Sequence, residues 1–162
     1  MEIHSVLRNS QDQELTVLYK DIDSISELEE RKVSAVHAYC FLGDKLVIVY
    51  AKSKGYWAPA GGGVEGKESV EEAVSREVKE ETNMRVLKQS LIGFQDISEP
   101  ERTITQTRSV CIVEPYGKFV SDPDDDITEI KLIDPAEYKK YFDWGAIGDH
   151  LMKRALELKR TL

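Results

Sequence analysis

Glutamates occupy the apolar face of a helix that the sequence predicts directly after a glycine-rich turn. At about 100° per residue, one side of this helix carries an apolar row with two carboxylates in it, formed by Val70, Ala73, Val74, Glu77 and Glu81, with Val78 and Glu80 at its opposite margins. Burying an unpaired carboxylate costs several kcal/mol unless a cation compensates it. The sequence therefore predicts a positive group beside these glutamates.

The bounds of this helix follow from signals at both of its ends. Ser69 is a favourable N-cap residue, and Glu72, three positions later, completes a capping box. Asn83 tolerates the left-handed conformation in which helices commonly end. We therefore expect a helix from about Val70 to Thr82, and we interpret Glu71 and Glu72 as part of its solvated face.

The spacing of these residues resembles the Nudix box, G-x5-E-x7-R-E-U-x-E-E-x-G-U, in which U is a bulky aliphatic residue. The matching residues are Gly62, Glu68, Arg76, Glu77, Val78, Glu80, Glu81 and Met84. Asn83 replaces the last glycine of the box, a change that the left-handed turn tolerates. Upstream, Ala60-Gly61-Gly62 stands where the family usually has Pro-Gly-Gly, and Pro59 comes one place early.

Three glutamates of the box predict a divalent-cation site. Glu77, Glu80 and Glu81 project from one side of the helix at a spacing of i, i+3 and i+4. Carboxylate oxygens suit hard cations, so we expect Mg²⁺, with Mn²⁺ as the alternative. The resemblance adds the carbonyl of Gly61 as a ligand, and Glu65 is a further candidate ligand or a supporting residue.

The expected reaction is attack by a metal-activated water on a diphosphate. Arg76 and Glu68 are expected to support the site, because an arginine fork holds carboxylates through paired hydrogen bonds. The resemblance implies that the general base is a glutamate of the box or of a later loop; the candidates are Glu80, Glu81, Glu99, Glu101 and Glu114. The acidic cluster also predicts coupled titrations, with activity falling below neutral pH.

Two aromatic residues are candidates for stacking on a nucleobase, Trp57 before the glycine turn and Phe94 at the end of a predicted strand. Trp57 has packing as its alternative role. Trp144 is expected to anchor the C-terminal helix.

The resemblance implies a nucleotide substrate, and three functions remain open. The size and general pattern resemble the MutT-like pyrophosphatases of (deoxy)nucleoside triphosphates. Pro100 resembles the proline that marks many ADP-ribose pyrophosphatases, although a turn would explain it equally well. Hydrolysis of ADP-ribose or a nucleotide sugar is therefore the second function, and a non-catalytic nucleotide-binding module is the third.

Length and composition predict one domain over residues 1–162, with a core at about 33–142 and a C-terminal helix at about 147–160. The chain has 162 residues, of which 41% are hydrophobic. A net charge of −8 argues against a broad nucleic-acid surface. A local basic patch around Arg102, Arg108 and Lys118 is the exception that the sequence allows.

The compartment predicted from the sequence is the cytoplasm. No targeting segment and no apolar run long enough to span a membrane occurs. Cys40 and Cys111 each fall in an apolar run and are expected to be free thiols. His4, His37 and His150 are too scattered to predict a zinc site. A homodimer is implied by the resemblance alone.

The expected fold class is α/β, the Nudix α/β/α sandwich with a mixed β-sheet. Strands are predicted at Glu14–Lys20 (an edge strand), Val33–Leu42, Lys45–Ala51, Val86–Phe94, Ser109–Glu114 and Ile127–Ile133. A short helix is expected from Asp134-Pro135 to about Phe142, and a terminal helix at Ile147–Arg160. Asp122–Asp126 is interpreted as an exposed turn rather than a second metal site.

Overall fold

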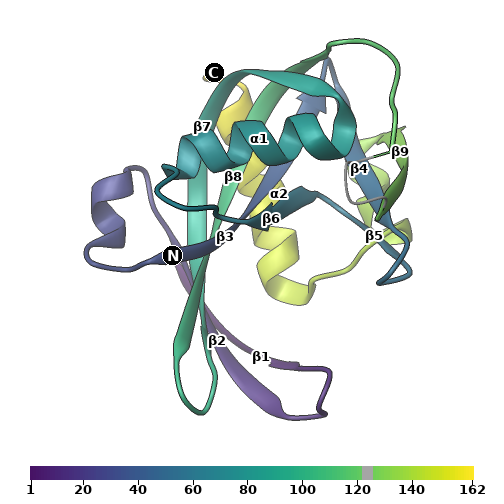
Figure 1. Cartoon of the computed structure of the whole chain (residues 1–162). Helices are drawn as coiled ribbons and strands as arrows, with labels where there is room; N and C mark the ends of the chain where they lie inside the picture. Colours follow the sequence, from purple (N-terminus) through teal and green to yellow (C-terminus); the bar gives the residue numbers. More distant parts are fainter. Residues whose placement is uncertain (122–125) are drawn as a thin grey trace.

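The computed structural model describes residues 1–121 and 126–162. Its strands are β1 (Glu2–Arg8), β2 (Glu14–Asp21), β3 (Val33–Leu42), β4 (Lys45–Ala51), β5 (Tyr56–Ala58), β6 (Ala60–Gly63), β7 (Met84–Ser98), β8 (Thr103–Pro115) and β9 (Ile127–Ile133). The α-helices are α1 (Val70–Thr82) and α2 (Gly145–Lys159), and two short 3-10 helices are η1 (Ile25–Leu28) and η2 (Pro135–Lys140) (Figure 1).

One mixed sheet joins these strands in the order β1-β2-β7-β8-β3-β4-β5. The pairing of β3 with β8 is parallel, and the remaining pairings are antiparallel. β3 pairs with β4 through its second half and with β6 through its first half, so the glycine-rich strand lies directly against the centre of the sheet.

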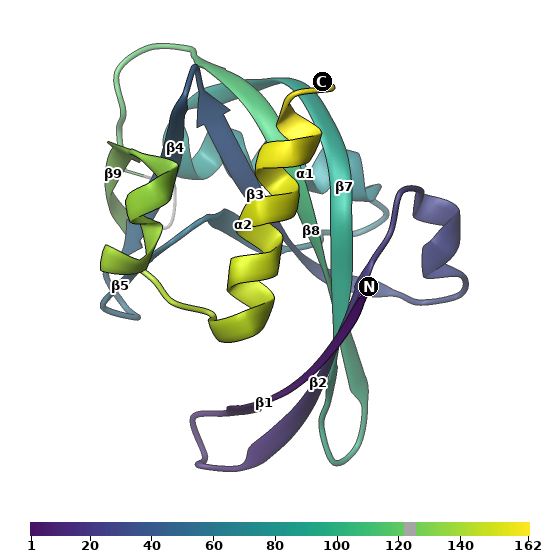
Figure 2. The same cartoon turned by 180° about the vertical axis from the view of Figure 1, so that it is seen from behind.

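The two α-helices cover opposite faces of the sheet. Figure 1 shows α1 in front of it, and Figure 2, the view from behind, shows α2 across the other face. Alternation along β3 separates the two cores: Val36, Ala38 and Cys40 pack toward α1, whereas Tyr39 and Phe41 belong to the cluster that contains α2. The predicted α/β/α sandwich with a mixed sheet is confirmed.

The structure corrects three predictions about the strands. β1 was not predicted, because its apolar residues, Ile3, Val6 and Leu7, do not alternate regularly with polar ones. It pairs with β2 and takes the edge position that was expected for residues 14–20. β7 and β8 extend well beyond their predicted bounds, and their far ends form with β1 and β2 an arm that projects from the layered body (Figures 1 and 2). Polar residues fill these extensions, so the sequence pattern did not show them.

Predictions about the second half of the chain fare differently. η2 begins where a short helix was expected, with Asp134 as N-cap and Pro135 at its first position. β9 has its predicted bounds, and α2 begins two residues early. The turn expected at Asp122–Asp126 lies, except for Asp126, outside the described residues.

The two cysteines lie side by side beneath α1. Cys40 of β3 is the register partner of Cys111 of β8, and both are fully buried free thiols. The hydrogen bond with the Cys111 thiol, together with burial, raises the pKa of Cys40, which favours the protonated thiol. Within residues 1–121 and 126–162, no helix has the length and apolarity that crossing a membrane requires.

A carboxylate at the end of β2 attaches α2 to the sheet. Asp21 accepts hydrogen bonds from the Tyr19 hydroxyl at 2.7 Å and His150 Nε2 at 2.8 Å. Arg154 lies 3.6 Å from the same carboxylate and donates to the carbonyls of Ile92 and Ile22. Burial opposes ionisation of Asp21, but the bonds from Tyr19 and His150 prevail and lower its pKa.

Replacing this carboxylate should weaken the fold in a pH-dependent way. A lowered pKa in the folded state contributes stability above the unfolded pKa of about 4, and this stability is lost as pH falls through the folded value. We expect Asp21→Asn to lower the free energy of unfolding by about 2 kcal/mol at pH 7, with the difference from wild type shrinking below pH 4. Urea unfolding at several pH values measures this. Asp44→Asn, in the exposed β3–β4 turn, is the control, and an equal loss in both variants would contradict the assignment.

Candidate active site

The capping contacts of α1 fix which way its glutamates face. Ser69 Oγ accepts from the Glu72 N–H at 3.1 Å, and the Glu72 carboxylate accepts from the Ser69 N–H at 3.2 Å. Asn83 adopts the left-handed conformation, with φ 55° and ψ 38°, and its side chain donates to the carbonyl of Lys118. The predicted helix, Val70–Thr82, is confirmed to the residue.

Arg76 is the cation that the sequence requires beside the glutamates. All five of its N–H groups have acceptors. Nε and Nη2 donate to the two oxygens of Glu68 at 2.7 and 3.0 Å, and Nη2 also donates to the Gly63 carbonyl at 2.8 Å. Nη1 donates to Glu77 Oε1 at 2.9 Å and to Glu80 Oε2 at 3.2 Å. The structure therefore brings the predicted supporting pair, Arg76 and Glu68, together with two predicted metal ligands.

Negative charge exceeds positive charge around this arginine. Burial raises the pKa of Glu77. The charges of Glu80 and Glu65 add to this rise, and Arg76 opposes it. The Arg76 hydrogen bond lowers the pKa of Glu68, as does the backbone N–H of Glu65. Several carboxylates thus share one guanidinium, and their excess negative charge would favour binding of a further cation.

Two glycines of β6 make space for the glutamates. A Cβ atom at Gly62 would lie 2.4 Å from Glu77 Oε1, and the N–H of Gly61 donates to Glu81 Oε1 at 2.7 Å. A Cβ atom at Gly61 would lie 2.3 Å from the Val36 carbonyl and 2.7 Å from the His37 ring. The glycines are required because the backbone passes between a carboxylate on one face and a histidine on the other.

The donor set fits a hard divalent cation, although its oxygens are held by protein groups. Within the described ranges no three acidic, histidine or cysteine side chains form a ready metal cluster. Arg76 Nη1 binds both Glu77 and Glu80, whereas the Gly61 N–H binds Glu81. Their oxygen chemistry and excess charge still suit Mg²⁺ or Mn²⁺.

A cleft of about 580 Å³ lies on the opposite face of the sheet, beside the start of α2. The β1–β2 arm forms one apolar wall, and β3, β7 and β8 supply a polar floor made by His37, Gln95, Gln106 and Arg108. Lys54, Tyr56 and Trp144 line its rim. His37 pairs with Gly61, so this cleft and the glutamates meet across β6.

Arg108 is almost completely buried at the floor of the cleft, with 3% of its surface exposed. Burial lowers its pKa to about 10, so it still carries a charge at neutral pH. Burial of the His37 ring, together with the charges of Arg108 and Lys54, lowers the pKa of His37 well below its usual range and keeps the ring neutral.

The aromatic candidates occupy different environments. Trp57 is half-buried against Tyr50, with ring centroids 5.3 Å apart, and Lys131 lies over its ring. Its placement matches the packing role, and its contact with a base stays a prediction. Phe94 is only 1% exposed and packs beneath Arg31, so its placement does not support base stacking. Trp144 immediately precedes α2 and packs on Phe142, as expected.

The downstream base candidates lie on β8 or in the turn that precedes it, not on α1. Glu99 and Glu101 belong to the turn between β7 and β8 at the tip of the arm, where Glu99 pairs with Arg102. Glu114 pairs with Arg85 near the end of β8. The structure does not bring together the basic residues that the sequence allows as a local patch: Arg102 lies in the turn between β7 and β8, Arg108 is buried within β8, and Lys118 follows β8.

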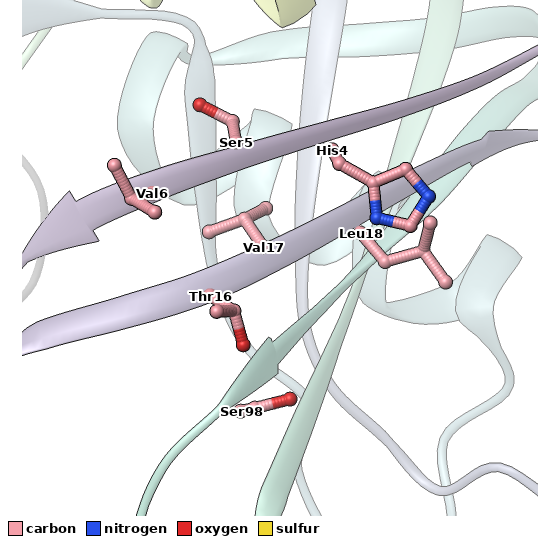
Figure 3. A pocket seen from close by; sticks show the side chains of 7 residues that line it. All are labelled: His4, Ser5, Val6, Thr16, Val17, Leu18 and Ser98. Carbon is pink, nitrogen blue, oxygen red and sulfur yellow. The ribbon is translucent and has the colours of Figure 1, made fainter.

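A second hollow, on the β1–β2 arm, lacks the groups that the expected reaction needs. Figure 3 shows the side chains that line it, His4, Ser5, Val6, Thr16, Val17, Leu18 and Ser98. Among these there is no carboxylate, lysine or arginine. The cleft beside α2 is the better candidate for binding a substrate.

The family model for the NUDIX domain matches residues 31–154. The chain belongs to the Nudix family. The expected family is confirmed, and its members act on nucleoside diphosphate derivatives. No curated protein sequence matches the chain.

Solved structures with the same fold include three that span most of this Nudix chain. A mutant of the pyrophosphohydrolase BsRppH from Bacillus subtilis is 21% identical, with a TM-score of 0.73, and the match covers 94% of this chain and 96% of that one. MutT of Aliivibrio salmonicida and Vibrio cholerae is 19% identical, with a TM-score of 0.58 and coverage of 78% and 99%. The Nudix domain of Shewanella oneidensis NrtR, in complex with ADP-ribose, is 16% identical, with a TM-score of 0.61 and coverage of 81% and 90%.

Replacing Gly62 by alanine tests whether the space beside Glu77 matters for metal binding. Gly62→Ala would press its Cβ against the Glu77 carboxylate, so we expect weaker Mn²⁺ binding and at least about tenfold lower turnover. Gly63→Ala is the matched control, because a Cβ there meets only the Ser34 carbonyl, at 3.8 Å. Mn²⁺ titration followed by electron paramagnetic resonance measures the affinity, and equal affinity in both variants would show that Glu77 does not contribute.

Proposed function

We propose that this Nudix protein hydrolyses a nucleoside diphosphate linked to another group, in a Mg²⁺-dependent reaction, with (deoxy)nucleoside triphosphates as the leading substrates. The observation that carries the proposal is the cluster of glutamates around Arg76, with Glu77 buried against Gly62. A solvated acidic face would not need a glycine to make room for its carboxylate.

The residues of the box would divide the work. Glu77, Glu80 and Glu81, with the Gly61 carbonyl, would hold the metal, which when bound neutralises the diphosphate and lowers the pKa of a water. Arg76 and Glu68 keep these carboxylates in place. Glu80 is our candidate for the base, since its side chain is 36% exposed against 12% for Glu77 and can meet a water.

The cleft beside α2 would receive an organic part of the substrate. It meets the glycine strand at His37, so a diphosphate at the glutamates and a group in the cleft would lie on either side of β6. ADP-ribose or a nucleotide sugar is the alternative substrate, supported by the ADP-ribose complex of the NrtR domain. That likeness also keeps the non-catalytic binding module as a third function.

Two buried free thiols support a reducing compartment, and we propose the cytoplasm. The homodimer implied by the resemblance stays a prediction.

Neutralising single glutamates tests the metal assignment. We expect Glu77→Gln and Glu81→Gln each to lower turnover by about 100-fold or more, because each removes an anionic ligand. Unfolding curves close to wild type would show that the fold is retained. Glu71→Gln, on the exposed first turn of α1, is the control. Near-wild-type turnover in both site variants would contradict the assignment.

A substrate panel separates the three functions. With Mg²⁺, nucleoside monophosphate and pyrophosphate as products would support triphosphate hydrolysis, whereas AMP and ribose phosphate from ADP-ribose would support the alternative. Binding of these nucleotides without turnover of any panel member would support the binding module.

A further inference from the structure

We propose that the floor of the cleft beside α2 is an oxyanion subsite that takes a phosphate or carboxylate group of the substrate, separate from the diphosphate at the glutamates. The assignment of this group to a substrate rests on the proposed function. The binding itself rests on the groups that line the cleft, independently of that function.

The first observation is a buried arginine that has no counter-charge among the described residues. Arg108 uses three of its five N–H groups: Nη1 donates to the Thr107 carbonyl and meets His37 Nδ1, and Nη2 donates to Gln106 Oε1, each at 3.1 Å. All three acceptors are neutral. In the part of the chain that the structure describes, Arg108 has no carboxylate partner and its Nε has no hydrogen-bond partner. A buried cation of this kind is costly unless a ligand supplies the anion.

The second observation is the proton position that Arg108 imposes on His37. A guanidinium can only donate hydrogen bonds, so His37 Nδ1 must accept at their contact. The proton of the neutral imidazole is therefore on Nε2. This tautomer adds a hydrogen-bond donor to a floor that Arg108 already makes positive.

The third observation is the orientation of α2. Its N-terminal residues line the cleft, so the positive end of the helix faces the same space. No acidic residue lies in its first turn, and Trp144 at the N-cap makes no side-chain capping bond. Asp143 is the carboxylate of the lining, and it accepts the Gly145 N–H at 2.9 Å.

These three features select an anion over a neutral group. Lys54 at the rim adds another positive charge. A neutral nucleobase could accept some of these hydrogen bonds, but it would leave the guanidinium uncompensated. Phosphate or carboxylate oxygens would accept the hydrogen bonds and balance the charge together.

Titration of the metal-free wild-type protein with inorganic phosphate, and separately with acetate, tests the subsite. In the presence of EDTA, we expect the side-chain ¹⁵N signals of Arg108 Nε and His37 Nε2 to shift together and to saturate with at least one anion. Phosphate alone would identify a phosphate subsite, and acetate alone a carboxylate subsite. If neither anion shifts these signals beyond chloride at the same ionic strength, the proposal is overturned.

Variants test whether the arginine provides the affinity. We expect Arg108→Gln to weaken binding of the active anion about tenfold or more, which corresponds to the loss of a charged hydrogen bond. Arg102→Gln, at the exposed tip of the arm, should bind like wild type. Equal affinity in the two variants would overturn the role of Arg108, and the wild-type titration decides even if Arg108→Gln fails to fold. Anion binding without turnover of any nucleotide would refute the proposed function and leave the subsite standing.

Discussion

The pairing of Arg76 with a cluster of glutamates is the interaction on which the arrangement of the site depends. A single guanidinium holds Glu68 through two bonds and shares its remaining donors among Glu77, Glu80 and the Gly63 carbonyl. Without it, Glu77 would be a buried carboxylate repelled by its neighbours, which would favour protonation or exposure. The arginine therefore opposes the rise in the pKa of Glu77 that burial causes, and its hydrogen bonds hold Glu68, Glu77 and Glu80 in place.

The glutamates can take these positions because the glycines of β6 have no side chains that would clash with them. Gly62 lets the Glu77 carboxylate approach the strand, and Gly61 does the same for the His37 ring on the other face. β6 in turn is held by the first half of β3, whose parallel pairing with β8 places Arg108 next to His37. One short strand thus connects an acidic site over one face of the sheet with a basic cleft over the other.

The sequence predicts the glutamates of the site because their geometry depends on a single helix. Ser69, Glu72 and Asn83 determine the helix, so the relative directions of Glu77, Glu80 and Glu81 follow from spacing alone. The cleft is made by strands that are distant in the sequence, and β1, which forms a wall, has no regular apolar alternation. The sequence did hold a sign of a role for Arg108. This residue directly precedes the predicted strand 109–114, and an arginine within a strand needs a partner for its charge. The sequence could not show that no carboxylate supplies one.

Arg76 is surrounded by an excess of negative charge, whereas the acceptors of Arg108 are neutral. This difference relates the proposed metal to the proposed substrate. Arg76 has all its donors engaged and more negative neighbours than it can neutralise. Among residues 1–121 and 126–162, Arg108 has unused donors and only neutral acceptors. Protein groups therefore leave a charge of opposite sign on each face of β6, negative near α1 and positive near α2. On the two proposals made above, a divalent cation would relieve the first and an anionic group the second, so a polyanionic substrate bound together with its metal would compensate both charges.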